Sequence, residues 1–212
     1  MLTVHHLSTS QSDRIVWLCE ELGIAYDLKR YERDSVTRLA PAEYRALHPI
    51  GTAPVITDGE LVLGESAAII DYIIHRHGQG RLAIAPGDAG YSDYLFWFHY
   101  ANGSFMPAAM MGLIAGMVAA GGSAAVGALT ERLDRAWDMV EARLGETPYL
   151  AGAEFTAADI MTLFPLTTMR LFAPRDIAGY PNVAAYLQRI GARDAFKRAM
   201  AKADPGFVVP LT

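Results

Sequence analysis

Two polar clusters in the first third of the chain have residue types and positions suited to binding an anion. The first, residues 8–12, reads Ser-Thr-Ser-Gln-Ser and directly precedes a segment with helical spacing. The second, Glu65-Ser66, lies where a strand-like segment gives way to another helical one. The exposed N–H groups and the dipole at a helix start attract negative charge. Both clusters also have a purely structural interpretation, because such residues commonly cap helices.

A proline, Pro54, opens the strand-like segment between these two clusters. Proline cannot donate a hydrogen bond to a neighbouring strand, and the bond before it is the one place where a cis peptide costs little free energy. Taken alone, the tripeptide Ala53-Pro54-Val55 favours an ordinary edge proline over a ligand-binding one.

The segments that position these residues alternate between strand-like and helix-like patterns. Strands are expected at residues 3–7, 26–31, 54–57 and 61–63, and helices at 14–22, 41–47 and 65–77. Asp58-Gly59 is a strong hairpin signal, and Gly23 stands where the first helix would stop. The order βαβ-α-ββα predicts a small mixed α/β sheet with helices packed on it.

From about residue 88 the strand patterns stop. Helices are expected at residues 88–120, 130–144, 156–172, 182–190 and 194–203. Thr156 and Asp159 have the spacing of a capping box, whose role is in folding. We therefore predict an α/β domain over residues 1–78, a linker over 79–87 and an all-helical bundle over 88–212.

Composition and charge exclude several functions. The net charge of -5 over 212 residues leaves no basic surface for nucleic acid. The single cysteine, Cys19, excludes an internal disulfide and a multi-cysteine metal site, and its place on an apolar stripe indicates packed core. His5-His6 would point to opposite faces of a strand, so no metal is expected. The first residues show no export signal, which favours a cytoplasmic protein.

Residues 95–130 carry no formal charge and raise the question of a membrane span. A span needs about 20 mainly apolar residues. Pro107 and the sequence Gly121-Gly122-Ser123 interrupt this segment, so we expect a buried helix near a ligand cleft and no membrane. Its methionines, Met106, Met110 and Met111, have the helical spacing that is usual for a core. Methionine side chains also adapt to varied apolar ligands.

Three ordered motifs resemble the glutathione transferase superfamily, in particular its bacterial and fungal branch. They read HHLSTSQSDRIVWLCEELGIAYDLKRYER, HPIGTAPVITDGELVLGESAAIIDYI and YLAGAEFTAADI, and the match runs nearly the whole length. The resemblance implies a thioredoxin-like glutathione-binding domain followed by an all-helical one, and a homodimer. It also implies an enzyme that transfers the thiolate of glutathione to an apolar electrophile.

The resemblance assigns the thiol to the loop at residues 8–12. Ser10 would donate its hydroxyl to the sulfur, with Thr9 and Ser12 as alternatives because the loop aligns only to within a residue. Lowering the pKa of a thiol by about two units takes about 2.7 kcal/mol. One charge-assisted hydrogen bond supplies about 1.5–3 kcal/mol, so a single hydroxyl is sufficient.

The resemblance also assigns residues to the rest of glutathione. Ser66 would bind the γ-glutamyl carboxylate and Glu65 the neighbouring ammonium. Pro54 would be cis, so that the backbone of Val55 pairs with the cysteinyl part. Thr52 would contact the glycyl carboxylate.

Two positions depart from the family pattern. Thr52 stands where the family often has a basic residue. The glycyl carboxylate of glutathione would therefore be held more weakly, or by another residue. Gln11 stands where an arginine is frequent. These departures leave a non-catalytic glutathione-binding protein as an alternative. A glutathione-dependent isomerase, peroxidase or dehalogenase is another alternative, because such enzymes share the thiolate and differ in the shape of the pocket.

Overall fold

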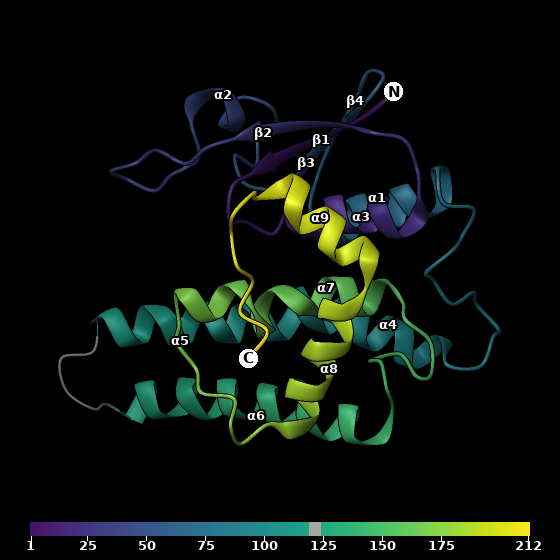
Figure 1. Ribbon diagram of the computed structural model, residues 1–212. Coiled ribbons are helices and arrows are strands. Elements are labelled where there is room, and N and C mark those ends of the chain that lie inside the picture. Colours follow the sequence, from purple (N-terminus) through teal and green to yellow (C-terminus); the bar gives the residue numbers. More distant parts are fainter. Residues whose placement is uncertain (119–123) are drawn as a thin grey trace. The chain divides into compact units, whose positions relative to one another are not determined.

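A computed structural model describes residues 1–118 and 124–212 (Figure 1). Contacts divide the chain into two units. The sheet unit contains Met1–Ala83 and Ala192–Val209, and the helical unit contains Ile84–Gly191 and Pro210–Thr212. The contacts thus group residues 192–209 with the sheet, whereas the predicted boundaries group them with the helices.

Four strands form the sheet: β1 (Leu2–Leu7), β2 (Asp27–Tyr31), β3 (Val55–Asp58) and β4 (Leu61–Gly64). Their order is β2-β1-β3-β4. β1 and β2 are parallel, whereas β3 is antiparallel to both β1 and β4. This mixed sheet confirms the predicted α/β class, and β1 and β3 are its two central strands.

Helices α1 (Asp13–Leu22), α3 (Ser66–Arg76) and α9 (Asp194–Ala203) cover one face of the sheet (Figure 1). α1 packs against both of the other helices. It ends at Gly23, whose φ of 62° is left-handed and whose N–H donates to the carbonyl of Cys19, as the sequence predicts. The amino ends of α1 and α3 therefore belong to one layer.

The other face of the sheet is covered by α2 (Ala42–Arg45) (Figure 1). Tyr44 of α2 packs there with Leu7, Tyr31 and Val55. Since side chains alternate along a strand, the neighbour of Leu7 in β1, His6, lies on the face of α1 and α9.

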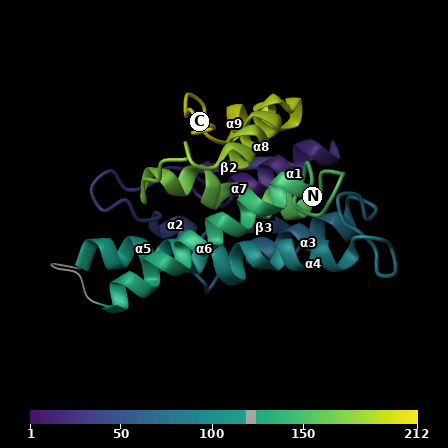
Figure 2. The same ribbon diagram turned by 90° about the horizontal axis from the view of Figure 1, so that it is seen from below.

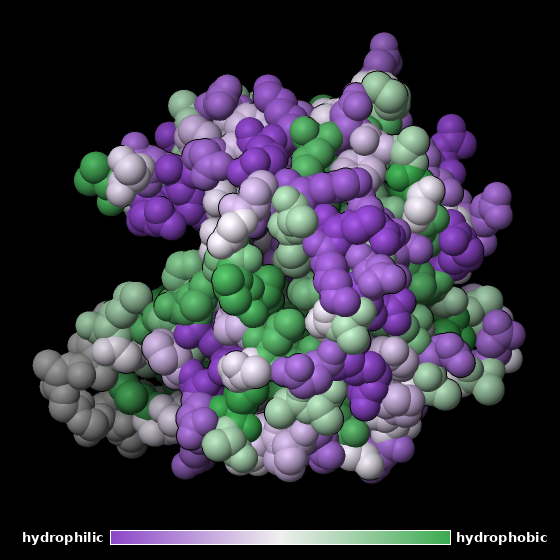
Figure 3. Space-filling view, viewed as in Figure 1, coloured by the Kyte–Doolittle hydropathy of each residue, from purple (hydrophilic) through white to green (hydrophobic). Residues whose placement is uncertain are grey.

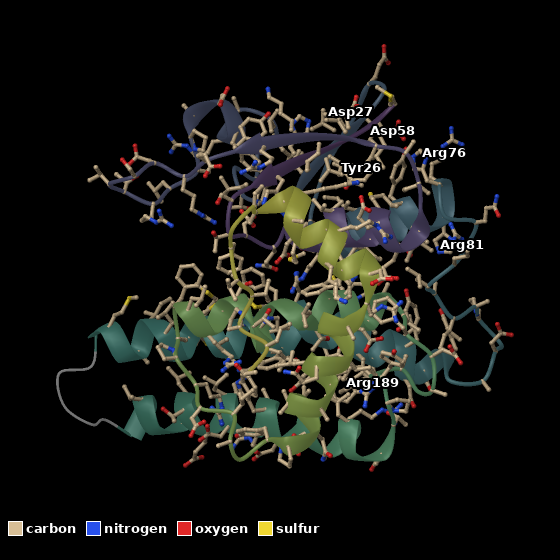
Figure 4. All side chains as sticks on the ribbon, in the orientation of Figure 1. Tyr26, Asp27, Asp58, Arg76, Arg81 and Arg189 are labelled. Atoms are coloured by element: carbon tan, nitrogen blue, oxygen red, sulfur yellow. The ribbon has the colours of Figure 1, made fainter. Side chains whose placement is uncertain are left out.

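Hydrogen bonds fix the connections of the sheet unit, and Figure 4 labels two of the residues that make them, Asp58 and Arg81. Asp58 ends β3 and accepts hydrogen bonds from the Tyr72 hydroxyl at 3.0 Å and from His77 Nε2 at 2.7 Å. Arg81 donates through Nη2 to the carbonyl of Leu22 at 2.5 Å. These contacts tie the hairpin and the following segment to the ends of α3 and α1.

The helical unit contains six helical segments and one short 3₁₀ turn among its described residues. They are α4 (Tyr91–Tyr100), a π-helical turn (Ala101–Phe105), α5 (Met106–Val118), α6 (Ala124–Glu146), α7 (Ala157–Leu166), the 3₁₀ turn (Thr168–Leu171) and α8 (Pro181–Ala192). α5 and α6 lie side by side (Figure 2). Residues 119–120 of the helix predicted at 88–120 lie outside the described residues. Among the described helices, none has the length and apolarity that crossing a bilayer requires.

The helix predicted over residues 156–172 ends at Leu166. The Thr167 hydroxyl donates to the carbonyl of Leu163 at 2.9 Å, the group that its own N–H would bond in a continued helix. That N–H instead donates to Phe164 at 3.3 Å. The side chain thus competes with the backbone and converts the last turn to a 3₁₀ segment.

The capping box at the start of α7 is confirmed, and it supports a stability prediction. The Thr156 hydroxyl accepts from the Ala158 N–H, and Asp159 accepts from the Thr156 N–H at 2.9 Å. We expect Thr156→Ala to lower the free energy of unfolding by about 1 kcal/mol, measured by chemical denaturation. Thr156→Ser keeps the hydroxyl and is the control; an equal loss in both variants would contradict the role of the cap.

Candidate functional site

The loop at residues 8–12 directs two of its hydroxyls into the protein. Ser12 is fully buried; its Oγ accepts from the Leu7 N–H at 3.0 Å and lies 2.9 Å from His6 Nδ1. Ser10 is also buried, and its Oγ donates to the Leu7 carbonyl and lies 2.7 Å from Ser12 Oγ. Both hydroxyls are therefore engaged beneath the loop.

Thr9 differs from its two neighbours. It is half-buried, with a left-handed φ of 52°. Its N–H donates to both carboxylate oxygens of Asp204, at 3.2 and 3.3 Å. Its hydroxyl lies 3.5 Å from Ser8 Oγ, at the long end of hydrogen-bond distances. The Thr9 hydroxyl can thus turn to a ligand at little cost.

Ser66 is buried at the first position of α3. Its Oγ accepts a hydrogen bond from Arg14 Nη1 at 3.1 Å. Because a hydroxyl has a single hydrogen, accepting from Arg14 leaves that hydrogen to be donated to an anion. The same Nη1 also donates to Gln11 Oε1. Arg14 therefore joins the loop before α1 to the start of α3.

Glu65 is exposed and precedes α3 with φ 71° and ψ 121°. Side-chain-bearing residues rarely adopt this conformation, which costs about 1–3 kcal/mol. Its carbonyl accepts the Ile69 N–H at 2.9 Å. The strained backbone thus holds a carboxylate in the solvent beside Ser66.

The segment before β3 contains the cis peptide Ala53–Pro54, which confirms that prediction. Val55, predicted to pair with the cysteinyl part, is buried and stands in register with His5 of β1 and Gly64 of β4. Ala53 is half-buried and lies outside that register, and Thr52 is exposed. Val55 thus begins β3, and Ala53 and Thr52 precede the strand.

Sequence reasoning missed Arg14. It is buried, and burial lowers the pKa of its guanidinium to about 10, although the neighbouring Asp13 opposes that shift. The available signal was a cation that interrupts the apolar stripe of α1. A buried arginine requires partners, and its partners are two of the candidate binding segments.

Asp13 makes the stability of the fold depend on pH. Its Oδ1 is buried with no hydrogen-bond partner among the described residues. Burial raises the pKa of Asp13 to about 6, although Arg14 and His6 lower it. Between pH 4 and 6 the unfolded state has then lost a proton that the folded state keeps, so stability falls as pH rises.

We expect the free energy of unfolding of the wild type, relative to Asp13→Asn, to fall by about 2 kcal/mol between pH 4 and 6.5. Denaturant titrations at several pH values measure this difference. Asp194 is the first residue of α9 and is exposed, so Asp194→Asn is the matched control. A pH-independent difference for Asp13→Asn would contradict the raised pKa.

Cys19 contributes no thiolate to this site. Cys19 is buried, and burial raises the pKa of its thiol far above the ordinary value, so it stays protonated. Within the part of the chain that the structure describes, no three His, Cys, Asp or Glu side chains converge as metal binding requires.

Comparison with known proteins tests whether this chain belongs to the family that its motifs resemble. Residues 4–81 match the glutathione S-transferase N-terminal domain, and residues 123–189 match the glutathione S-transferase C-terminal domain. Glutathione S-transferase 3 of Zea mays is 31% identical over 89% of this chain and 87% of its own length. This chain belongs to the glutathione S-transferase family.

Two further relatives extend the match of this glutathione transferase to nearly its whole length. Glutathione S-transferase 3 of Schizosaccharomyces pombe is 29% identical over 96% of this chain and 88% of its own length. A solved glutathione S-transferase from Actinobacillus pleuropneumoniae is 34% identical, with a TM-score of 0.88 over 96% of this chain and 93% of its own. The two-domain fold and the transferase assignment thus agree with the resemblance seen in the motifs.

Proposed function

We propose that this glutathione transferase joins the thiolate of glutathione to an apolar electrophile. One observation carries the proposal: Arg14 joins the hydroxyl loop before α1 to Ser66 at the start of α3. Two helix starts thereby offer separate places for two anions, a thiolate and a carboxylate. Glutathione has these two groups.

The thiolate is assigned to the loop at residues 8–12. The sequence favours Ser10, whose hydroxyl already donates to Leu7. The half-buried Thr9 hydroxyl has only a long contact to give up, so it is our first candidate for the hydrogen-bond donor to the sulfur. The Ser10 hydroxyl is the second candidate. Ser12 is fully buried against His6, so its hydroxyl holds the loop from beneath and does not face the thiol.

The γ-glutamyl group is assigned to the start of α3. Ser66 donates its free hydrogen and its amide to the carboxylate, and the exposed Glu65 binds the ammonium. The backbone of the cysteinyl part of glutathione pairs with the protein backbone beside the cis proline. Ala53 is one candidate partner because it lies outside the strand register, and Val55 is the partner that the sequence predicts. Thr52, exposed beside them, is left for the glycyl carboxylate.

An apolar surface on the helical unit supports an apolar second substrate. Figure 3 shows apolar atoms gathered over α5 and the end of α7. The exposed apolar residues there are Met110, Ile114, Met117, Leu171 and Phe172. Met117 and Phe172 also line a cavity of about 430 Å³ that Leu133 and Trp137 close from α6. A cavity of this size suits a small molecule.

Conjugation kinetics test the proposal. We expect the wild type to join glutathione to chlorodinitrobenzene and other apolar halides, with lower kcat/KM for electrophiles that carry a charge. Ultraviolet titration should give a thiol pKa for bound glutathione below that of the free peptide. Binding without a lowered thiol pKa and without turnover would instead favour a non-catalytic binding protein. The homodimer and the cytoplasmic location stay predictions.

A further inference from the structure

A chain of buried polar groups connects the end of α9 to the loop at residues 8–12. Asp204 follows α9 and is buried. Its Oδ2 accepts from His6 Nε2 at 3.1 Å, and His6 Nδ1 lies 2.9 Å from Ser12 Oγ. Ser12 Oγ lies in turn 2.7 Å from Ser10 Oγ. Four side chains from three segments thus form one network under the loop.

Asp204 also contacts the loop directly. Both of its carboxylate oxygens accept the Thr9 N–H. On the opposite side of the loop, Arg33 donates through Nε to the Ser8 carbonyl at 2.9 Å and through Nη2 to the Thr9 carbonyl at 3.4 Å. The peptide of Thr9, with its left-handed φ, is therefore held from both sides.

The carboxylate of Asp204 fixes the direction of its hydrogen bond with His6. Burial works to raise the pKa of Asp204, but hydrogen bonds from His6, Ser8 and Thr9 hold it below the ordinary value. An ionised carboxylate can only accept, so Nε2 of His6 carries the hydrogen. The next hydrogen bond joins His6 Nδ1 to Ser12 Oγ, which also accepts the Leu7 N–H. The single hydrogen of the Ser10 hydroxyl points to the Leu7 carbonyl and to Ser12 Oγ, which both lie 2.7 Å from Ser10 Oγ.

We propose that Asp204 and His6 are positioning residues for the thiolate-binding loop, with Asp204 holding the Thr9 peptide and His6 holding Ser12 and Ser10. The inference rests on the proposed function and makes the end of α9 part of the thiol site. The inward bonds keep Ser10 and Ser12 beneath the loop, so that the Thr9 hydroxyl is the one presented. Removing Asp204 releases the Thr9 peptide and the His6 ring together.

The test compares Asp204→Ala with Arg198→Gln. Arg198 lies on α9, the helix that Asp204 follows, and pairs with Glu20 of α1 at 3.1 Å. The Arg198→Gln variant therefore loosens α9 without touching Thr9. For Asp204→Ala we expect the pKa of bound glutathione to rise by about one unit, which is tenfold less thiolate below that pKa. At pH values below that pKa, kcat should fall about tenfold, whereas KM for glutathione should change less than about threefold. Arg198→Gln should leave all three unchanged.

Further variants keep the test decisive. Asp204→Asn still accepts the Thr9 N–H and should restore most of the wild-type thiol pKa. Should Asp204→Ala fail to fold, His6→Gln, which keeps the carboxylate on Thr9, is expected to raise the thiol pKa by a smaller amount. A wild-type thiol pKa in both Asp204→Ala and His6→Gln, or an equal change in Arg198→Gln, would overturn the positioning role. Bound glutathione with an unshifted pKa in the wild type would overturn the proposed function and this inference with it.

Discussion

Thr9→Val is expected to raise the pKa of glutathione bound to the enzyme by about one to two units and to lower kcat about ten- to a hundredfold below that pKa. Valine has nearly the shape of threonine, so the loop and the Thr9 N–H contact with Asp204 remain. The hydroxyl that would donate to the sulfur is lost. Ultraviolet titration of bound glutathione and the pH profile of kcat measure the effect.

Ser10→Ala is the matched variant, since it removes the neighbouring hydroxyl of the same loop. The Ser10 hydroxyl donates inward to the Leu7 carbonyl, so we expect this change to affect stability more than the thiol. The opposite pattern, a thiol pKa that rises in Ser10→Ala and not in Thr9→Val, would return the role to Ser10. Equal and small effects would assign the sulfur to backbone N–H groups at the start of α1.

Glu65→Gly is expected to make the protein more stable and a weaker binder of glutathione. Glycine adopts the positive φ of this position without strain, so relief should raise the free energy of unfolding by about 1 kcal/mol. Loss of the carboxylate should weaken glutathione binding about ten- to a hundredfold, the value of one hydrogen bond to a charged group. Denaturant titration and calorimetry measure the two quantities.

Glu65→Gln separates the two effects, because it keeps the strained backbone and removes only the charge. We expect Glu65→Gln to bind glutathione as weakly as Glu65→Gly does, with the stability of the wild type. If Glu65→Gln instead binds like the wild type, the ammonium of glutathione is held elsewhere. A Glu65→Gly variant that is less stable would show that the carboxylate supports the fold.

Local patterns were enough to predict the order of strands and helices. Gly23 stops α1 because its left-handed φ suits glycine, and Asp58-Gly59 turns the hairpin. Such signals act between residues close in sequence. The early end of α7 could not be predicted, because the Thr167 hydroxyl can bond either to solvent or to the backbone. Only the bond to the backbone carbonyl of Leu163 interrupts the helix.

The contacts that hold the candidate site in place could not be predicted, because they join residues far apart in the sequence. His6 and Asp204 are 198 positions apart, so no local pattern reports their contact. Arg14 could be recognised as an unusual buried cation, but not as the partner of Ser66. The choice between Thr9 and Ser10 depends on which of the two hydroxyls is bonded inward, which residue types alone leave open.

The return of the last helix to the sheet unit sets an order of assembly during synthesis. A ribosome releases the amino end first, yet Thr9 needs a carboxylate 195 positions later in the chain. At the usual 5–20 residues per second, that delay is about 10–40 s. During this time the nascent sheet lacks α9, whose Phe196 covers Trp17 of α1. The loop at residues 8–12 thus leaves the ribosome well before the carboxylate that holds it, so a nascent enzyme gains its thiol site only after Asp204 has emerged.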